Sequence, residues 1–343
     1  MANLRANNIV GVGSTDAGVV FDGVTKIKTQ NYFYLQTGNT DARFPNFATN
    51  AVSPNSARGV FGGGSTPTIV NTIEYITIAT TGNATDFGDL TTARRLAGSC
   101  ASSTRGLFGG AYNPYSASIE YITISSTGNA LSFGNLTQSR GILSSCSNSI
   151  RGLFGGGYVT PAAVNTIDYV TIASTGNAQD FGDLFTGSYA TSACASPTRG
   201  VLGNGRVPSV TNTLEYITIA STGNSKDFGD LTQARSGSAA CSSSTRGLFG
   251  GGESPGAQNT IDYLTISTTG NAVDFGDLTQ ARFYLASCSS IIRGVFGGGM
   301  TPTKVNTIDY VTITSTSNAT DFGDLTEIKN YLAACSNGHG GLG

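Results

Sequence analysis

The segment RGVFGGGMTPTKVNTIDYVTITSTSNATDFGDLTEIKNYLAACSN, Arg293 to Asn337, contains four short runs of strand character. These runs are RGVFGGG, NTIDYVTI, ATDFGDLT and LAACS. The second alternates apolar and polar residues with a period of two, which is typical of a half-buried strand. β-Branched and aromatic residues are common in these runs, Gly, Asn, Ser and Pro separate them, and none has helical spacing. The segment therefore predicts an all-β structure.

Working outward, the same pattern recurs along most of the chain. Its Arg-Gly pair returns at intervals of 46 to 48 residues, at Arg58, Arg105, Arg151, Arg199, Arg246 and Arg293. A fixed period of this length indicates an array of one supersecondary unit. Four strands in about 47 residues match one propeller blade, whereas a β-helix coil would repeat in roughly half that length. The sequence thus predicts a β-propeller.

The repeat resembles the Kelch type over about residues 18–343. The resemblance rests on a di-glycine, a third-strand Tyr, an aromatic with a Leu, and a downstream Arg, here Gly62-Gly63, Tyr75, Phe87, Leu90 and Arg94. The chain departs from that family in having no Trp, with Phe in its place. The repeats are nearly identical, low in charge and rich in Ser, Thr, Asn and Gly. In this they also resemble repeat proteins of tailed-phage virions, particularly marine ones.

The number of blades follows from counting the repeats. The third-strand Tyr occurs six times, and a worn seventh copy precedes these, with Gly18–Gly23 and Gln30–Asn39 as its strands. At the other end, Tyr331–Asn337 forms one more inner strand without the rest of a blade. We therefore predict seven four-stranded antiparallel blades in a single domain over residues 18–343. The carboxy-terminal inner strand would join the amino-terminal blade and so close the ring, and residues 1–17 would form an arm.

Composition limits the classes of partner. The chain has 343 residues, a formal net charge of −2 and only 12% charged residues, which gives no support to a basic nucleic-acid-binding or membrane-binding face. Polar residues and Gly interrupt every stretch long enough to cross a bilayer, and residues 1–10 lack the apolar core of a secretion signal. We expect synthesis in a cytoplasm, no membrane insertion and no nucleic-acid partner.

Six cysteines occupy one equivalent place on the innermost strand: Cys100, Cys146, Cys194, Cys241, Cys288 and Cys335. Equivalent residues of neighbouring blades should lie beyond the ~4.4 to 6.8 Å Cα separation that a disulfide needs. The spacing also lacks the short CxxC pairs of a zinc site. We interpret the cysteines as reduced, buried structural residues, with a metal ring as the weaker alternative.

The remaining motifs give no enzymatic signal. FGGG connects two strands and does not enter a helix, as a phosphate-binding loop would. His339 has no nucleophile tied to it and is interpreted as a flexible surface residue. Asn83, Asp86 and Asp89 lack the dense oxygen ligands of a calcium loop and suit turns and strand caps. The prediction is a non-enzymatic protein without cofactor or metal.

The Arg of each Arg-Gly pair recurs together with an acidic residue before the Tyr, at Glu74, Glu120, Asp168, Glu215, Asp262 and Asp309. Recurrence in every blade favours a structural role, because a binding site rarely needs six identical copies. We expect charge-assisted bonds within or between blades. A multivalent anion site is the second interpretation.

The repeats differ mainly between the Arg and the Tyr, where the separation varies from 16 to 18 residues. The connection from each outer strand to the next inner strand keeps its length but varies in residues. Because strands alternate in direction, both kinds of loop should emerge on one face, where loops commonly carry recognition. The candidate binding residues are Arg95, Tyr112, Tyr115, Tyr158, Tyr189, Arg206, Glu253, Tyr284, Met300, Lys304 and Tyr331.

The leading functional hypothesis is a non-enzymatic phage-type virion protein. It would be a tail or fibre module or an adaptor, and it would bind other virion proteins or a host-surface protein or glycan. Its location would be the virion. An intracellular, cytoplasmic Kelch-like scaffold is the alternative, and an enzyme with a site at the ring axis is third. A homo-oligomer and neutral drift of the loops both stay open.

Overall fold

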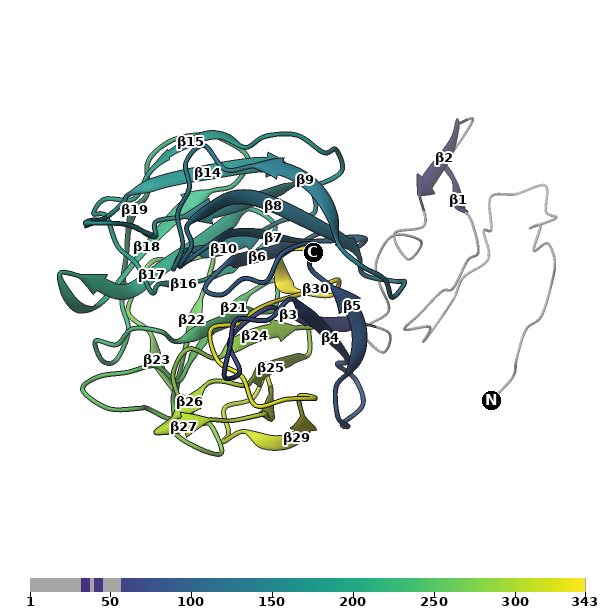
Figure 1. Cartoon of the computed structure of the whole chain (residues 1–343). Coiled ribbons are helices and arrows are strands. Elements are labelled where there is room, and N and C mark those ends of the chain that lie inside the picture. Colours follow the sequence, from purple (N-terminus) through teal and green to yellow (C-terminus); the bar gives the residue numbers. More distant parts are fainter. Residues whose placement is uncertain (1–31, 38–39, 46–56, 343) are drawn as a thin grey trace. The chain divides into compact units, whose positions relative to one another are not determined.

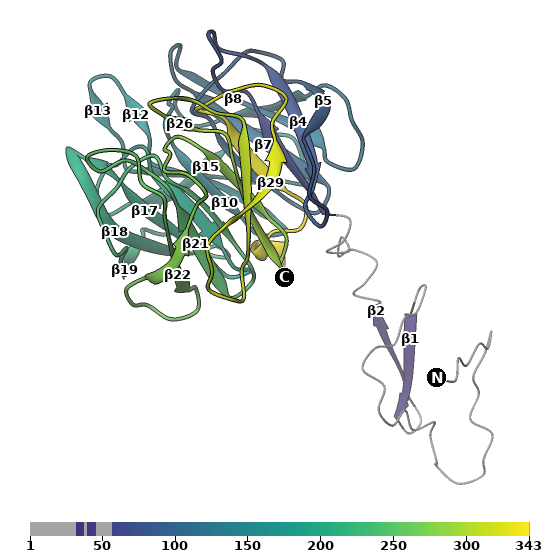
Figure 2. The same cartoon turned by 90° about the horizontal axis from the view of Figure 1, so that it is seen from below.

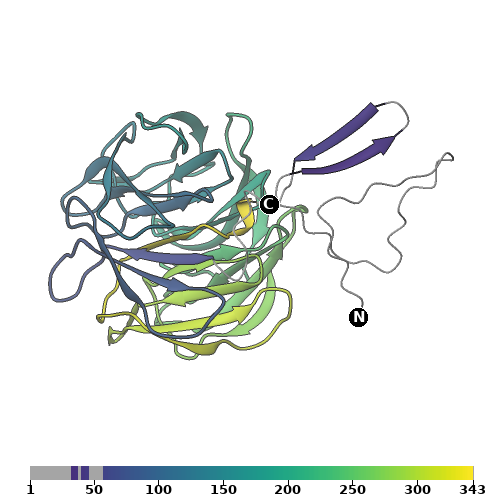
Figure 3. The same cartoon turned by 90° about the vertical axis from the view of Figure 1, so that its right-hand side faces the viewer.

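The computed structural model describes residues 32–37, 40–45 and 57–342, and the chain divides into two compact units, Met1–Thr49 and Asn50–Gly343. In the first unit, β1 (Tyr32–Thr37) and β2 (Thr40–Pro45) pair as an antiparallel hairpin (Figure 3). In the second, six four-stranded antiparallel sheets form a β-propeller (Figure 1). The predicted all-β propeller of four-stranded blades is confirmed.

The strands of each blade are given from the innermost to the outermost. Blade 1 contains β30 (Ala333–Ser336), β3 (Arg58–Gly62), β4 (Thr72–Thr77) and β5 (Thr85–Asp89). Blade 2 contains β6 (Gly98–Ala101), β7 (Arg105–Ala111), β8 (Ser116–Thr123) and β9 (Leu131–Asn135). Blade 3 contains β10 (Ser144–Ser147), β11 (Arg151–Gly155), β14 (Thr166–Thr171) and β15 (Gln179–Asp183).

Blade 4 contains β16 (Ser192–Ala195), β17 (Arg199–Val207), β18 (Ser209–Thr218) and β19 (Lys226–Asp230). Blade 5 contains β20 (Ala239–Ser242), β21 (Arg246–Gly250), β22 (Thr260–Thr265) and β23 (Val273–Asp277). Blade 6 contains β24 (Ala286–Ser289), β25 (Arg293–Gly297), β28 (Thr307–Thr312) and β29 (Thr320–Asp324). Two loops add small hairpins, β12 (Tyr158–Val159) with β13 (Ala162–Ala163) and β26 (Met300–Thr301) with β27 (Thr303–Lys304). A 3₁₀ turn, η3 (Gly340–Leu342), follows β30.

The prediction of seven blades is wrong, because the worn copy does not build a blade of this ring. Aligned on its Thr-Gly-Asn, that copy has Phe44 at the place of Gly88 in blade 1. A Cβ at Gly88 would lie 2.6 Å from the backbone of Gly128 in the next blade, so this position excludes any side chain. The predicted strand Gln30–Asn39 overlaps β1, which pairs with β2. Gly18–Gly23 and the boundary between residues 17 and 18 lie outside the described residues.

Ring closure uses the carboxy-terminal inner strand, with a different partner from the one predicted. β30 pairs antiparallel with β3, with Gly59 opposite Ser336 and Gly62 opposite Ala333. In Figure 1 the yellow β30 lies beside the dark blue β3. The backbone N–H of Arg58 also donates to Oδ1 of Asn337 at 2.8 Å. Blade 1 is therefore completed by residues from the two ends of the ring.

The apolar core lies between neighbouring blades. Between blades 1 and 2, Val60, Phe87 and Leu90 share one buried cluster with Phe108 and Ile122. Val60 and Phe108 are completely buried. Each such layer is repeated around the ring, so every blade depends on both neighbours for burial of its apolar side chains.

The Gly of the Arg-Gly pair has a steric function in this packing. A Cβ at Gly247 would lie 2.5 Å from Sγ of Cys194 in the preceding blade, and one at Gly59 would lie 2.4 Å from Sγ of Cys288. The six cysteines are free and buried, and burial raises the pKa of Cys241 to about 12. Each thiol thus fills the space that the neighbouring glycine leaves empty.

The Arg of the same pair connects one blade to the next. The guanidinium of Arg58 lies 4.7 Å from the ring centroid of Tyr75, and its Nη1 donates to the carbonyl of Ile124 in blade 2 at 3.1 Å. The other five copies stack on the third-strand Tyr of their own blade in the same way: Arg105, Arg151, Arg199, Arg246 and Arg293. Each of these also donates to a main-chain carbonyl of the following blade.

The recurring acidic residues pair with a different cation, the one that follows the outer strand of the preceding blade. Arg235 Nη2 lies 3.0 Å from Asp262 Oδ2, and both side chains are completely buried. The equivalent pairs are Arg94 with Glu120, Arg140 with Asp168, Arg282 with Asp309, and Lys329 with Glu74. Blade 4 departs from this rule, because Ser188 replaces the Arg and Glu215 instead accepts from the N–H of Phe185 at 2.9 Å.

The Asn of each Thr-Gly-Asn or equivalent turn also bridges two blades. Asn129 Oδ1 accepts from the N–H of Asp89 at 3.0 Å, and Asn271 Oδ1 accepts from the N–H of Asp230 at the same distance. The same contact recurs with Asn83, Asn177, Asn224 and Asn318. These turns are near copies because one geometry must be satisfied six times.

Candidate functional site

The two ends of the propeller differ in their sequences. One end, called here the variable face, carries the loops between second and third strands and the connections from each outer strand to the next inner strand. These two kinds of segment meet there: Tyr112 N–H donates to the carbonyl of Arg95 at 3.1 Å, and Phe283 N–H donates to that of Met300 at the same distance. The uniform face carries the near-identical turns. In Figure 2, β12, β13 and β26 lie at one end of the ring and the carboxyl terminus lies at the other.

Six equivalent residues form a circle around the axis on the variable face. They are Leu96, Ile142, Ala190, Gly237, Tyr284 and Tyr331, all with φ between 52° and 64°. Each donates its N–H to the carbonyl of the equivalent residue of the preceding connection at 2.7 to 3.0 Å, and Leu96 closes the circle by donating to Tyr331. We call this set the axial ring. The left-handed conformation is unusual for residues other than Gly, and a β-branched residue such as Ile142 is a strong outlier there.

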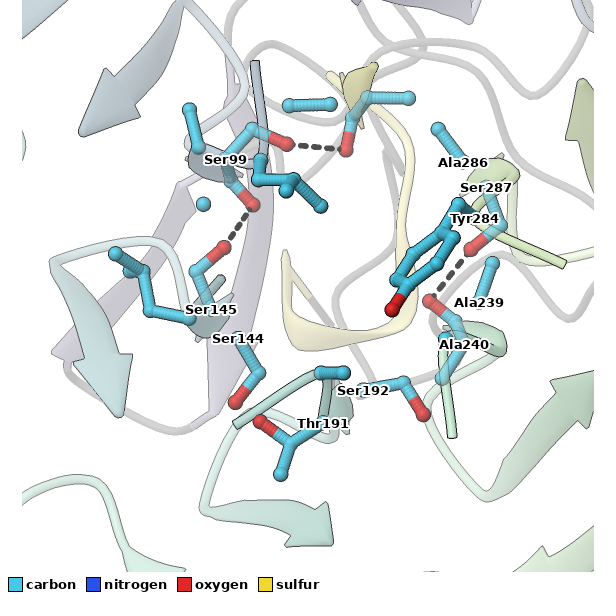
Figure 4. Close-up of a pocket in the computed structure, with 18 of the residues that line it drawn as sticks. Ser99, Ser144, Ser145, Thr191, Ser192, Ala239, Ala240, Tyr284, Ala286 and Ser287 are labelled. Carbon is cyan, nitrogen blue, oxygen red and sulfur yellow. Dashed lines mark hydrogen bonds between the residues drawn. The ribbon is translucent and has the colours of Figure 1, made fainter. Parts of the chain in front are cut away.

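A cavity lies within the axial ring and continues between the inner strands. It has about 660 Å³ of empty space, part of which is open solvent, and every residue that lines it is uncharged. Ser99, Ser145 and Ser287 donate to carbonyls of neighbouring inner strands at 2.6 to 2.8 Å (Figure 4). Thr191 also lines the cavity, and its buried hydroxyl has no hydrogen-bond partner in the part of the chain that the structure describes. The wall therefore offers hydroxyls on an otherwise apolar surface.

The other end of the axis is covered by the carboxy-terminal segment. His339 Nε2 donates to the carbonyl of Ala101 at 2.9 Å, and its Nδ1 accepts from the N–H of Gly341. A Cβ at Gly340 would lie 2.0 Å from the carbonyl oxygen of Ser243, so the segment packs closely on a turn of blade 5. His339 is partly exposed but held by these hydrogen bonds, so its interpretation as a flexible residue is wrong. Burial lowers the pKa of His339, because a charged imidazole would lose its hydration there.

Aromatic side chains are concentrated at the mouth of the cavity. The rings of Tyr284 and Tyr331 lie 4.6 Å apart between centroids, and Phe283 lies 5.4 Å from Tyr284. Tyr284 reaches over the cavity in Figure 4. Burial raises the pKa of Tyr284 to about 12, so its phenol stays protonated at neutral pH and can donate a hydrogen bond.

Arg95 extends this aromatic group towards blade 2. Its guanidinium carbon lies 5.7 Å from the ring centroid of Tyr331 and 5.8 Å from that of Tyr112. Tyr112 packs edge-on against Tyr115, whose hydroxyl is 2.9 Å from that of Thr160. A second pair, Tyr158 with Tyr189, has its centroids 5.1 Å apart. The structure thus groups seven of the predicted binding residues into two aromatic patches.

The four remaining candidates are polar or sulfur-containing residues of the same face. Arg206 and Glu253 form an ion pair at 3.1 Å, about one-third exposed. Lys304 Nζ donates to Ser65 Oγ at 3.2 Å, and Met300 Sδ accepts from the side-chain amide of Asn330 at 3.4 Å. All eleven predicted binding residues are partly exposed. They therefore form a surface and do not belong to the closed core.

Sequence reasoning missed most of the cavity wall. Tyr284 and Tyr331 were identified, but their equivalents Leu96, Ile142 and Ala190 were not. The sequence did contain a signal for these residues, because the residue type at this position varies between repeats although the connection keeps a constant length. The sequence does not show that backbone hydrogen bonds connect all six residues of the axial ring into one circle.

No family model matches this sequence, and no similar curated protein was found. Among the residues that the structure describes, no group of three His, Cys, Asp or Glu side chains is placed to hold a metal ion. The same residues include no helix long and apolar enough to cross a membrane.

Proposed function

We propose that this protein is a non-enzymatic binding module that recognises its partner with the variable face and the mouth of the axial cavity. We assign it to the tail, fibre or adaptor proteins of phage-type virions, where the partner would be a host-surface molecule or another virion protein. The virion assignment and the Kelch ancestry rest on the resemblance of the repeats. The assignment of the binding face rests on the geometry of the ring.

The observation that carries the proposal is the composition of the axial ring. Gly237 demonstrates that the scaffold accepts Gly at this left-handed position, where Gly has no steric penalty. The other five blades nevertheless hold Leu, Ile, Ala and two Tyr there. A non-Gly residue in this conformation costs on the order of 1 kcal/mol or more. Selection for stability alone would favour Gly in all six blades, so the retained side chains favour a role in recognition.

The neighbouring contacts point the same way. On the uniform face, the recurring Asn turns join neighbouring blades, and the carboxy-terminal segment covers that end of the axis. The variable face combines an open cavity, partly exposed aromatic side chains and residues that differ from blade to blade. Such aromatic groups supply most of the binding energy in many recognition surfaces.

The test compares matched triple variants in binding of labelled protein to a panel of bacterial cells and to purified virion proteins. The variable-face variant replaces Tyr112, Tyr115 and Tyr158 by Ala, and the control replaces Asn129, Asn177 and Asn271 by Ala. The first should lose binding with only a small fall in melting temperature, because the three side chains are partly exposed loop residues outside the buried core. The second should melt earlier and keep its affinity per folded molecule. Loss of binding by the control at unchanged stability would overturn the proposal.

A further inference from the structure

We infer that the axial mouth binds an acidic sugar, the carboxylate-bearing terminal residue of a glycan. The sugar ring would enter the mouth against Tyr331 and Tyr284, and its carboxylate would lie between Arg95 and Lys304. This inference rests on the proposed function and names the class of ligand for the same face.

The cavity wall suits a hydroxylated, compact ligand. The wall carries no charge, and Ser144, Thr191, Ser192 and Ser238 contribute hydroxyls to it. The partnerless hydroxyl of Thr191 is the one most in need of a ligand, because a buried polar group without a hydrogen bond costs roughly 1 to 3 kcal/mol. A sugar ring offers donors and acceptors on every edge and can satisfy such groups without bringing a charge into the cavity.

The two tyrosines supply the apolar part of such a site. Tyr284 and Tyr331 are adjacent members of the axial ring, and the angle between their planes is 54°. A sugar ring has one face made of C–H groups, which can pack on an aromatic ring and remove apolar surface from water. The backbone circle fixes the main chain of both tyrosines at the mouth, and their rings pack against each other, which reduces the conformational entropy lost when a ligand binds.

Two cations lie at the same edge of the mouth. Arg95 stacks on Tyr331 and makes no ion pair with any described residue, and its buried Nε has no hydrogen-bond partner there. Lys304 reaches Ser65, whose backbone N–H binds the carbonyl of Asn330 next to Tyr331. Burial and the neighbouring charge of Arg95 lower the pKa of Lys304. Neither cation has an ion-pair partner among residues 57–342, and positive charge that is left uncompensated favours a bound anion.

Arg206, a third cation of the variable face, differs from these two in having a carboxylate partner. It already pairs with Glu253 at 3.1 Å and binds Ser236 Oγ through Nε at 3.2 Å. Its charge is therefore compensated within the protein. The uncompensated positive charge is confined to the Arg95 and Lys304 side of the mouth, which gives the acidic group one position relative to the sugar ring.

The experiment uses the full chain on an array of oligosaccharides terminated by glucuronic, galacturonic or N-acetylneuraminic acid. Each is printed beside the neutral oligosaccharide that lacks the acidic group, and hits are measured by calorimetry. We expect at least one acidic glycan to bind ten-fold or more tightly than its neutral counterpart. Arg95→Ala should reduce this preference to less than two-fold, and Arg95→Lys should keep part of it. Lys226→Ala removes an exposed cation of β19 outside the candidate binding residues and should leave the preference unchanged.

Four results would overturn the inference. The first two are an array without any bound glycan and equal binding of the neutral and acidic members of every pair. The other two are an acidic preference that survives Arg95→Ala and equally tight Arg95-dependent binding of a poly-glutamate peptide. The proposed function would stand in each case if cell or virion-protein binding still required the variable-face tyrosines, so the two failures are distinguishable. Melting curves of each variant identify any that fail to fold.

Discussion

Replacing Arg235 by Met should destabilise the propeller strongly, because the arginine belongs to a buried ion pair between blades 4 and 5. The guanidinium is completely buried, lies 3.0 Å from Asp262 and donates to the carbonyl of Phe249 at 3.0 Å. Burial lowers the pKa of Arg235 and the charge of Asp262 opposes that shift. Each member of the pair is thus tolerated in the interior because of the other.

The size of the effect follows from what Arg235→Met leaves behind. Asp262 would keep two donors from Thr232, the N–H at 3.2 Å and the hydroxyl at 2.6 Å, but no positive charge. Coulomb attraction across about 4 Å is worth about 4 kcal/mol at an effective dielectric constant of 20. Breaking a buried pair from one side typically costs about 3 to 5 kcal/mol. We expect a loss in this range in the free energy of unfolding.

The assay is urea unfolding followed by circular dichroism, with Arg206→Met as the matched control. Arg206 makes the same kind of pair at the surface, so its loss should cost less than about 1 kcal/mol. The double substitution Arg235→Met and Asp262→Leu should recover part of the loss, because no uncompensated charge remains. If both single variants unfold at the same urea concentration, or if the double variant is the least stable, the assignment of this pair as a buried structural contact is refuted.

Four other outcomes are expected. Deleting Ala333–Gly343 removes β30 and should cause aggregation or a sharp fall in melting temperature, and an unchanged melting curve would contradict the observed closure. Cys241→Ser should cost about 1 to 3 kcal/mol, and alkylation at pH 8 should modify six thiols only after denaturation; fewer than six would indicate a disulfide. Gly247→Ala should cost about 1 to 3 kcal/mol by overpacking, with recovery when Cys194→Ala is added, and no recovery would count against the contact. Folding lowers the pKa of His339 below 6.5, so the folded protein binds a proton there less readily than the unfolded chain does. The free energy of unfolding should therefore decrease as the pH falls below about 6.5. The same decrease in the His339→Gln variant would show that other groups cause it.

Much of the fold could be predicted from the sequence, because the blade is a local unit whose sequence pattern is repeated six times. Strand order, the inner position of the cysteines and the division into variable and uniform faces all follow from one repeat. The blade count was wrong because it depends on whether a seventh, degenerate copy can meet the packing requirements of its neighbours. The degenerate copy has Phe44 at the position of Gly88, where the backbone of Gly128 leaves no room for a side chain. This close contact between blades cannot be seen in the sequence.

The contacts between blades were harder to predict. The acidic residue of each blade recurs in step with both Arg58 and Arg94 and their copies, so periodicity cannot say which of them it pairs with. In the structure Arg94 reaches Glu120 across the blade boundary, while Arg58 stacks on Tyr75. The axial ring was missed for a related reason, since its six members are distant in sequence and are joined only through their backbones.

Because β3 pairs with β30, blade 1 cannot be completed until the end of the chain has been synthesised. Arg58 and its hydrogen-bond partner Asn337 are separated by 279 positions, so the first strand of the ring is made long before its last neighbour. At a translation rate of about 5 to 20 residues per second, that interval lasts roughly 15 to 55 s. Throughout it, β3 has a free edge that could pair with another nascent chain. Ribosomes that follow one another closely on the same message would bring such chains together, so the spacing of translation becomes a determinant of the yield of closed rings.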